Sequence, residues 1–158
     1  MCIRDSAHPP GDDGKITLTT EYPDMIPFLT YAYSDSRRLE LYKEFRNRGH
    51  PANEALLKRM LKKRYELARL LGYRNWAEYI TEDKMIKTAE AAQRFIDKVA
   101  EVSAERARRD YEELLRVLKK THPDATEVGD WQKAYLEELL KREKYSVDSQ
   151  AVRAYFPF

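Results

Sequence analysis

The chain has 158 residues, the length of one domain, which buries roughly 70% of the surface that its unfolded chain exposes. Its 29 basic and 27 acidic residues give a formal net charge of +2, which argues against binding of nucleic acid or of an anionic membrane by the chain as a whole. No apolar stretch approaches the ~20 residues that span a bilayer. With 42% hydrophobic residues and only five glycines, the composition predicts a soluble, helix-rich protein.

The N-terminal residues predict no regular structure. Residues 1–6, MCIRDS, resemble a leader that arises when sequencing-adapter DNA is translated, and we expect them to be foreign to the protein. Residues 7–14 combine Pro, Gly and Asp and predict a linker or turn. The lone cysteine, Cys2, excludes an intramolecular disulfide and a cysteine zinc site. A lone cysteine fits a reducing compartment, so we expect a cytoplasmic protein, although a foreign leader hides the native start and any signal peptide.

The main body, residues 15–158, begins with the only strand that the pattern predicts. Residues 15–20, KITLTT, alternate apolar and polar side chains with a period of two. A short helix is expected from Pro27 to about Tyr33, because proline is tolerated in a first helical turn.

Two further helices follow. The first is expected from Arg37 to Arg48, with Gly49 in a left-handed conformation after it and three candidate N-caps before it, Ser34, Asp35 and Ser36. The second has Asn53 as its expected N-cap and ends at Gly72. Its apolar residues recur at spacings of three and four and share one face: Leu56, Leu57, Met60, Leu61, Leu67, Leu70 and Leu71.

A short helix is expected after Asn75, where Glu78 can reach back to complete a capping box. Three aromatic residues around it, Tyr73, Trp76 and Tyr79, are spaced three apart. They indicate a seam between packed elements, with a ligand-binding aromatic cage as the alternative.

The longest helix is expected over residues 89–120, after Thr88. At about 1.5 Å per residue it is roughly 48 Å long, whereas a compact chain of this size is only about 40 Å across. The length therefore indicates an elongated bundle or a part of a larger body. A further helix is expected after Asp130 as N-cap, and a last short turn after Asp148.

The residues that commonly perform catalysis are scattered. The three histidines, His8, His50 and His122, are far apart, and none is followed by Glu as a helical zinc-hydrolase motif requires. The neighbouring carboxylates Glu112–Glu113 and Glu137–Glu138 point about 100° apart on a helix, which predicts surface positions. No phosphate-binding loop or nucleophile elbow is present. We therefore assign no catalytic, cofactor-binding or metal-ligating residue to this chain.

One segment, LLKRMLKKRYELARLL, is strongly basic. Its six basic residues, Lys58, Arg59, Lys62, Lys63, Arg64 and Arg69, face only Glu66. A nucleic-acid groove would need aromatic side chains beside them, and Tyr65 is the only one in the segment. The solvated face of an amphipathic helix is the favoured interpretation, with a nucleic-acid surface as the alternative.

Five segments carry a resemblance that runs in order from about Ile16 to Phe158. They are ITLTTEYPDMIPFLTYA, RRLELYKEFRNRG, RYELARLLGYRNWAEYITEDKM, DWQKAYLEELLKREKYSVD and KYSVDSQAVRAYFPF. In this order they resemble the zinc metallopeptidase family of thimet oligopeptidase, neurolysin and oligopeptidase A. Gln132 and Leu136 depart from the Asp and the second Tyr that the family has at those positions.

The resemblance implies a mainly α fold. The chain would be an elongated multi-helix fragment, with one short N-terminal strand, of a larger two-lobed helical body split by a deep channel. It also implies one zinc ion, held by the two histidines of a His-Glu-x-x-His motif and by a later Glu, and hydrolysis of short peptides. In the family these residues all follow the Tyr-Phe-Pro stretch, so none is carried onto this chain.

We therefore expect a non-catalytic fragment of a zinc metalloendopeptidase, in which Zn²⁺ belongs to the parent protein. The expected partners are short peptide substrates and the missing C-terminal catalytic portion, without nucleic acid or membrane. Phe158 would mark the end of a truncated reading frame. The alternative is a stand-alone helical protein-interaction module without enzymatic activity. A fragment would carry apolar faces made for absent polypeptide, and the isolated chain would be marginally stable and aggregation-prone.

Overall fold

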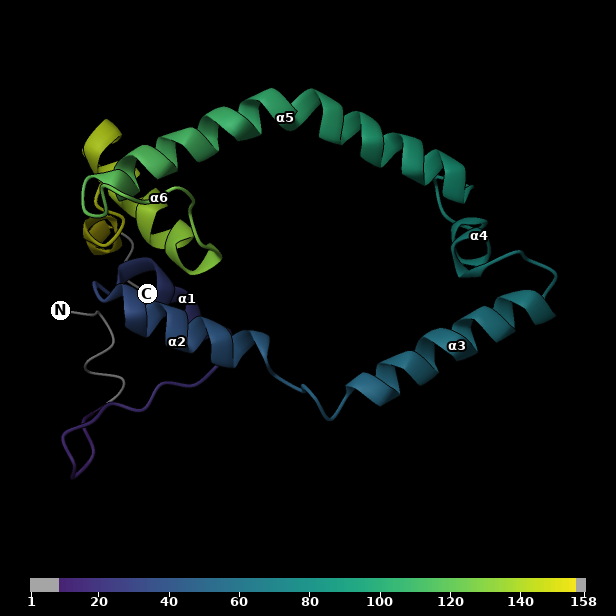
Figure 1. Cartoon of the computed structure of the whole chain (residues 1–158), viewed down its shortest axis with the longest axis horizontal. Coiled ribbons are helices and arrows are strands. Elements are labelled where there is room, and N and C mark those ends of the chain that lie inside the picture. The colour runs from purple at the N-terminus through teal and green to yellow at the C-terminus, as the bar shows by residue number, and fades with distance from the viewer. Residues whose placement is uncertain (1–8, 156–158) are drawn as a thin grey trace. The chain divides into compact units, whose positions relative to one another are not determined.

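The computed structural model describes residues 9–155, apart from the side chains of Arg153 and Ala154 (Figure 1). The leader with Cys2, His8 and residues 156–158 lie outside the described residues. Between residues 9 and 155 the chain forms helices and no strand, which confirms the mainly α fold class. The elements are α1 (Tyr22–Tyr31), α2 (Asp35–Arg46), α3 (Glu54–Leu70), α4 (Trp76–Thr81), α5 (Ala89–Lys119), α6 (Asp130–Tyr145) and the 3₁₀-helix η1 (Ala151–Tyr155). Of these helices, none has the length and apolar character that a membrane crossing requires.

The described residues belong to two compact units. The first runs up to Arg48, resumes at Arg109, and contains α1, α2, the last turns of α5, α6 and η1. The second unit, Gly49–Arg108, contains α3, α4 and the first two thirds of α5.

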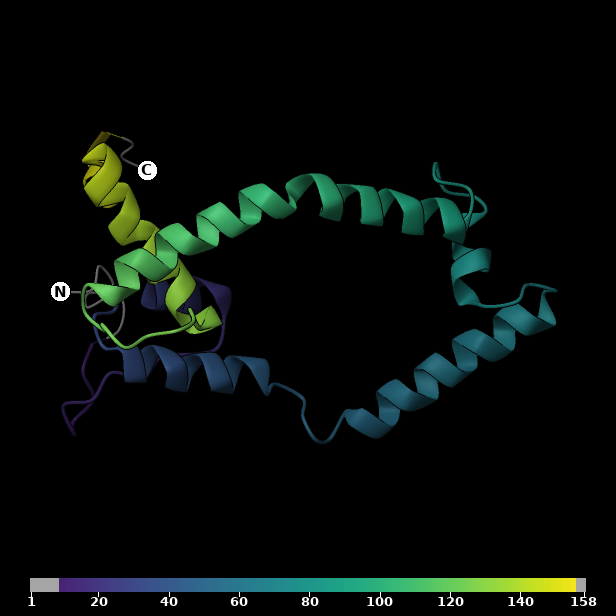
Figure 2. The same ribbon diagram turned by 45° about the horizontal axis from the view of Figure 1, so that its top comes forward.

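In the first unit α6 packs against both α1 and α2, and α1 packs against α2, as both views of the ribbon show (Figures 1 and 2). The core lies where the end of α5 meets α6. Its buried members are Leu114, Val117, Leu118 and Leu136, with Leu115, Ala125, Val128, Leu139 and Leu140 packed around them. The last turns of α5 thus bury their apolar side chains.

The strand expected over residues 15–20 is absent, and this prediction was wrong. A lone strand leaves its backbone groups unpaired, and the described residues supply no second strand to bond with it. The segment is instead tied to α1: the backbone N–H and the hydroxyl of Thr19 donate to the buried Asp24 carboxylate at 3.1 and 2.7 Å.

Helix α1 begins at Tyr22, earlier than the expected Pro27. The carbonyl of Glu21 accepts the first helical bonds, from the N–H groups of Asp24 and Met25. Pro23 therefore occupies the first turn, where the missing N–H costs little, and Pro27 lies one turn further inside the helix. Pro23, and not Pro27, is therefore the proline of the first helical turn, and the expected start at Pro27 was wrong.

Helix α2 begins and ends two residues earlier than expected, with Ser34, one of the three candidates, as its N-cap and Asn47 as its C-cap. The Ser34 hydroxyl accepts from the N–H of Arg37 at 3.4 Å, and Gly49 has the expected left-handed conformation, with φ +80°. Asn53 is the N-cap residue of α3, as expected, but its side chain makes no capping bond. At the other end of α3, Gly72 has φ +89°, and the N–H groups of Gly72 and Tyr73 donate to the carbonyls of Arg69 and Ala68. This paired bonding is the Schellman arrangement, which needs a left-handed residue such as glycine.

The remaining helices begin close to the expected residues. Asn75 caps α4 through a 3.0 Å bond from the N–H of Glu78, whereas the Glu78 carboxylate reaches back to Arg74 and not to Asn75. Thr88 caps α5 at 3.1 Å. The N-cap of α6 is Gly129, one residue before the expected Asp130.

We expect the small core to dominate the stability of the first unit. Leu136 is only 2% exposed, so Leu136→Ala should lower the free energy of unfolding by about 2–5 kcal/mol through lost burial and a residual cavity. Leu70→Ala is the matched control, because Leu70 is 83% exposed and its loss should change little. Urea unfolding followed by far-UV circular dichroism measures both; equal effects would contradict this core assignment.

Candidate functional site

The most deeply buried charge in the described part of the chain is the guanidinium of Arg38 on α2, with 3% of the residue exposed. It donates to the backbone carbonyls of Ala32 and Tyr33 at the C-terminal end of α1, and to the Asp35 carboxylate at 2.7 Å. The ring of Tyr135 on α6 lies 4.1 Å from the guanidinium carbon. The carboxylate, the negative end of the α1 dipole and the aromatic face together compensate the buried positive charge.

Asp35 connects this arginine to α6. The indole N–H of Trp131 donates to its carboxylate at 3.1 Å, and the Gln132 amide donates at 3.0 Å. Burial alone would raise the pKa of Asp35, but the hydrogen bonds from Gln132 and Trp131 and the charge of Arg38 outweigh it and lower the pKa. Asp35 is therefore held as a carboxylate with its donors in place. We refer to Asp35, Arg38, Trp131, Gln132 and Tyr135 as the α2–α6 junction.

The buried carboxylate of Glu138 corrects the prediction that the Glu137–Glu138 pair lies on the surface. Glu138 is 4% exposed, and it accepts from the N–H and the hydroxyl of Ser149 at 3.2 and 2.8 Å. The Arg142 guanidinium lies 3.4 Å away. The segment that follows α6 folds back over this side of the helix, which the helical pattern alone does not indicate. The half-buried Asp35 and the buried Glu138 thus both have partners that hold elements together.

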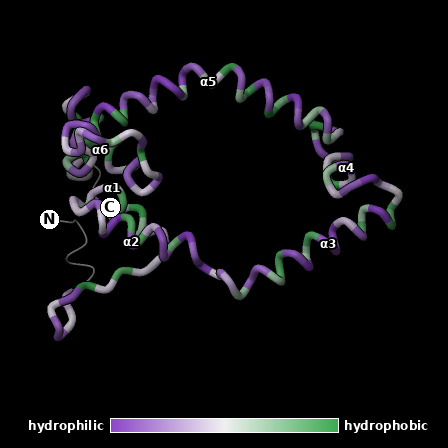
Figure 3. The backbone as a smooth tube through the Cα atoms, in the orientation of Figure 1, coloured by the Kyte–Doolittle hydropathy of each residue, from purple (hydrophilic) through white to green (hydrophobic). Residues whose placement is uncertain are grey.

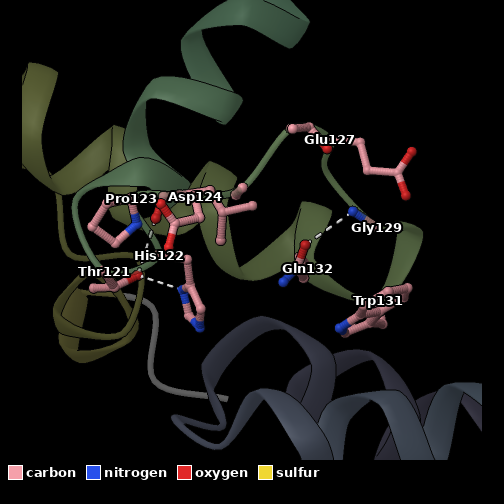
Figure 4. A pocket seen from close by; sticks show the side chains of 11 residues that line it. Thr121, His122, Pro123, Asp124, Glu127, Gly129, Trp131 and Gln132 are labelled. Carbon is pink, nitrogen blue, oxygen red and sulfur yellow. Dashed lines mark hydrogen bonds between the residues drawn. The ribbon is translucent and has the colours of Figure 1, made fainter.

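A cavity of about 600 Å³ lies between the end of α5 and the start of α6 (Figure 4). His122 lines it, with its Nδ1 2.9 Å from the Thr121 hydroxyl, and Trp131 and Gln132 form the opposite side in Figure 4. The Gln132 side chain accepts from the N–H of Gly129 at 2.9 Å and so starts α6. The polar groups of Trp131 and Gln132 are therefore engaged in the fold and not directed at a ligand.

A smaller cavity, of about 330 Å³, lies between the end of α1 and α6. Its wall includes three tyrosines, Tyr31, Tyr33 and Tyr135, and the charged residues Glu138, Arg142 and Asp148. Arg142 lies 3.3 Å from the Asp148 carboxylate and 3.4 Å from that of Glu138. Arg142 thus pairs with both carboxylates of the wall, which keeps a net charge of −1.

The structure does not bring the other residues singled out from the sequence together into one site. His50 lies exposed in the turn after α2. The basic residues of α3 are exposed, and three of them form ion pairs on the same helix: Lys58 with Glu54 at 2.7 Å, and Lys63 and Lys62 with Glu66 at 2.7 and 3.9 Å. This arrangement is typical of the solvated face of an amphipathic helix.

Tyr73, Trp76 and Tyr79 form a packed cluster, as the favoured interpretation predicts. The Tyr79 ring centroid lies 5.3 Å from those of both Tyr73 and Trp76, and Arg64 of α3 lies 5.5 Å from the centre of the Trp76 ring. The cluster joins α4 to α3.

Comparison with known proteins decides which family this arrangement belongs to. The sequence model of peptidase family M3 matches residues 28–158, which is most of the chain. The chain belongs to peptidase family M3.

Individual M3 relatives are similar over nearly the whole chain. Probable cytosolic oligopeptidase A of Arabidopsis thaliana is 32% identical over 149 residues, which are 92% of this chain and 21% of that protein. Organellar oligopeptidase A, chloroplastic/mitochondrial, of the same plant is 30% identical over 92% of this chain and 19% of its own length. Oligopeptidase A of Salmonella typhimurium is 32% identical over 89% of this chain and 22% of its own length. The chain therefore spans about a fifth of the length of these relatives.

The M3 resemblance implies zinc, and the residues that the structure describes do not fit a zinc site. No group of three or more His, Cys, Asp or Glu side chains in residues 9–155 is placed to hold a metal ion. His50 and His122 lie in different units, and the carboxylates of Asp35 and Glu138 already accept from Arg, Trp, Gln and Ser donors. No hydrolytic step can be derived from this set.

The sequence did not reveal the α2–α6 junction of this M3 chain. Asp35 was identified only as a possible helix cap, and its bonds to Trp131 and Gln132 span 96 and 97 residues. One signal was available: Gln132 and Leu136 stand where the family has Asp and Tyr. Gln132 donates to Asp35, which an ionised Asp could not do, and Leu136 is the most buried residue of the core.

We expect Asp35 to make the first unit sensitive to acid. Because its pKa in the fold lies below the ordinary value of 3.8, its stabilisation is complete above that value and is lost as the pH falls through the lowered pKa. Asp35→Asn should abolish this acid-dependent loss of stability, and it should lower the free energy of unfolding at pH 7 by about 1.5–3 kcal/mol. Urea titrations between pH 7 and pH 2 test this, with the exposed Asp12→Asn as control; an unchanged pH profile in Asp35→Asn would refute it.

Gly129 is expected to tolerate no side chain. A Cβ at this position would lie 2.3 Å from a ring carbon of Trp131, so Gly129→Ala must displace the indole and weaken its bond to Asp35. We expect a loss of about 1–3 kcal/mol and a red shift of the tryptophan emission. Gly11→Ala is the control, because its Cβ would meet the flexible Asp13 side chain at 3.2 Å and the Lys15 carbonyl oxygen at an ordinary contact distance of 3.7 Å. Wild-type emission and stability in Gly129→Ala would show that the Trp131 ring does not occupy this position.

Proposed function

We propose that this chain is a non-catalytic interior fragment of a zinc-dependent M3 metalloendopeptidase that hydrolyses short peptides. It would supply wall and scaffold of the peptide channel. The observation that carries the proposal is the M3 match over residues 28–158, together with relatives named oligopeptidases of which the chain spans about a fifth. Most of the parent enzyme, including its zinc ligands, would then lie in polypeptide outside this chain.

The chemistry of the described residues supports this division. The carboxylates of Asp35 and Glu138 and the two terminal nitrogens of the Arg38 guanidinium are engaged with one another, with the end of α1 or with neighbouring side chains and backbone, and so fix α1, α2 and α6. A general acid or base needs a lone pair or proton directed at substrate, and both carboxylates already accept hydrogen bonds from within the fold. The chain's own contribution to peptide hydrolysis would therefore be to hold a surface in place.

Large exposed apolar side chains also support a fragment. Leu70 and Met85 are 83% and 97% exposed, and Tyr155 is 81% exposed beside the end of the described chain. Leaving a large apolar side chain in water instead of burying it costs about 1.5–3 kcal/mol. Against a typical total stability of 5–15 kcal/mol, several such residues leave the isolated chain marginally stable.

The second candidate is a stand-alone helical interaction module without enzymatic activity. The uncovered apolar residues of α3 and α5 favour it, since a binding module would expose such a surface to its partner. We also propose a cytoplasmic location for the parent. One relative is named cytosolic and another organellar, so the names alone do not choose between compartments.

The isolated chain should bind no stoichiometric zinc and hydrolyse no peptide. Elemental analysis of the purified chain and cleavage of a quenched fluorescent peptide, with and without a chelator, measure these two properties. A full-length oligopeptidase A is the positive control. Stoichiometric zinc, or hydrolysis that a chelator abolishes, would contradict the proposal.

The genomic DNA beyond the codon for Phe158 distinguishes the two candidates. A fragment predicts that the reading frame continues to a helix with the His-Glu-x-x-His motif. A stop codon at this position in an intact genome would favour the interaction module.

A further inference from the structure

The chain that follows α6 folds back on this helix and is held there by two of its charged side chains. We call residues 146–155 the strap. The strap begins at Ser146, where a left-handed backbone conformation with φ +54° ends the helix. Its partners on α6 are Glu138 and Arg142, which are four residues apart and therefore lie on one side of the helix. Hydrophilic positions predominate along α6 (Figure 3), and the strap meets α6 through such positions.

Glu138 is at the centre of these contacts. Its buried carboxylate accepts from the backbone N–H and the hydroxyl of Ser149 at 3.2 and 2.8 Å. The same carboxylate lies 3.4 Å from the Arg142 guanidinium, which lies 3.3 Å from the Asp148 carboxylate on the strap. One buried side chain thus binds the strap directly and also orients the arginine that binds it a second time.

Asp148 carries this attachment into the backbone of the strap. Its carboxylate accepts from the N–H of Gln150 at 2.8 Å, and its carbonyl accepts from the N–H of Val152 in η1 at 3.3 Å. Because the same carboxylate pairs with Arg142, the fold of the strap and its attachment to α6 depend on one connected set of bonds. Connected bonds of this kind are lost together when one member is removed.

Apolar burial adds little to the attachment. The large apolar side chains described in the strap, Val147, Val152 and Tyr155, are 41%, 41% and 81% exposed. Leu136, on the same helix as Glu138, is by contrast almost fully buried in the core. Segments with few buried apolar contacts open locally at a lower free energy than the core does. The strap therefore has the composition of a segment that opens while α6 stays packed.

We propose that the strap opens and closes on α6 as a unit, that Glu138 holds it closed, and that it gates the cavity between α1 and α6. Asp148 and Gln150 of the strap line this cavity of about 330 Å³, as do Glu138, Arg142 and Thr30 of α1. When the strap opens, Asp148 and Gln150 leave the wall, and the cavity becomes accessible to larger ligands. No step of peptide hydrolysis enters this inference, so it stands apart from the proposed function.

Hydrogen exchange resolved at single amides tests whether the strap opens as a unit. We expect the N–H groups of Ser149, Gln150 and Val152 to share one opening equilibrium and to exchange much faster than the core amides of α6. Glu138→Gln should raise this equilibrium about tenfold or more, because an amide replaces a carboxylate that accepts two hydrogen bonds. Glu137→Gln is the matched control. The Glu137 side chain is 46% exposed and pairs with Lys133 on α6, so its loss should leave the strap unchanged.

Thiol labelling tests the gating of the cavity. Thr30→Cys in a Cys2→Ser background places one thiol in the cavity wall. Added Glu138→Gln should raise the rate at which a bulky maleimide modifies this thiol, in step with the faster exchange of the strap amides. Added Glu137→Gln should not raise it.

Three results would overturn the proposal. The first is faster exchange at Ser149 alone in Glu138→Gln, without Gln150 and Val152, because the strap would then not move as a unit. The second is exchange of the strap amides only together with those of α6, and the third is a labelling rate at position 30 that Glu138→Gln leaves unchanged. Far-UV circular dichroism checks the fold of each variant. Where Glu138→Gln unfolds the chain, Ser149→Ala removes only the hydroxyl bond and should speed the same exchange about fivefold.

Discussion

The first unit depends on the burial of one positive charge. Arg38 lies almost completely out of water, where an uncompensated guanidinium would be very costly. Its compensation comes from three elements at once: the carbonyls that end α1, the Asp35 carboxylate at the start of α2, and the Tyr135 ring of α6. Asp35 also accepts hydrogen bonds from Trp131 and Gln132 of α6. Any displacement of α6 would therefore leave both Asp35 and Arg38 with fewer partners. The apolar core beside this junction is small, so polar geometry has a large share in fixing the helices.

This use of charge bears on function. Carboxylates with a shifted pKa or deep burial often indicate catalysis, but Asp35 and Glu138 of this M3 chain accept hydrogen bonds from side chains and backbone of the fold itself. Such junctions fix the direction of the helices, because hydrogen bonds to charged groups are directional whereas apolar contacts are not. In the loop between α5 and α6, the absence of a side chain at Gly129 leaves room for the Trp131 ring. The ring can therefore lie against the backbone and donate its indole N–H to Asp35.

The long helix α5 has two different environments along one face. Its last turns bury their apolar residues against α6, while its first turns expose residues of the same kind. Helices of this length gain most of their stability from packing of the apolar face and little from intrinsic propensity. The exposed turns of α5, like the apolar residues of α3, are therefore less stabilised by packing within the described chain than its last turns are.

The sequence by itself determined the helical class, the family, and most helix ends, because these depend on neighbours a few residues apart. Ser34, Asn75 and Thr88 cap helices through bonds three residues long, and Gly72 ends α3 because only its own backbone must turn left-handed. Only the tertiary structure decided that residues 15–20 form no strand, since a strand needs a partner. It also decided that Asp35 binds Trp131 and that Glu138 is buried, because these depend on segments distant in the sequence or on a chain that folds back. Local sequence patterns do not indicate which distant segments of the chain come into contact.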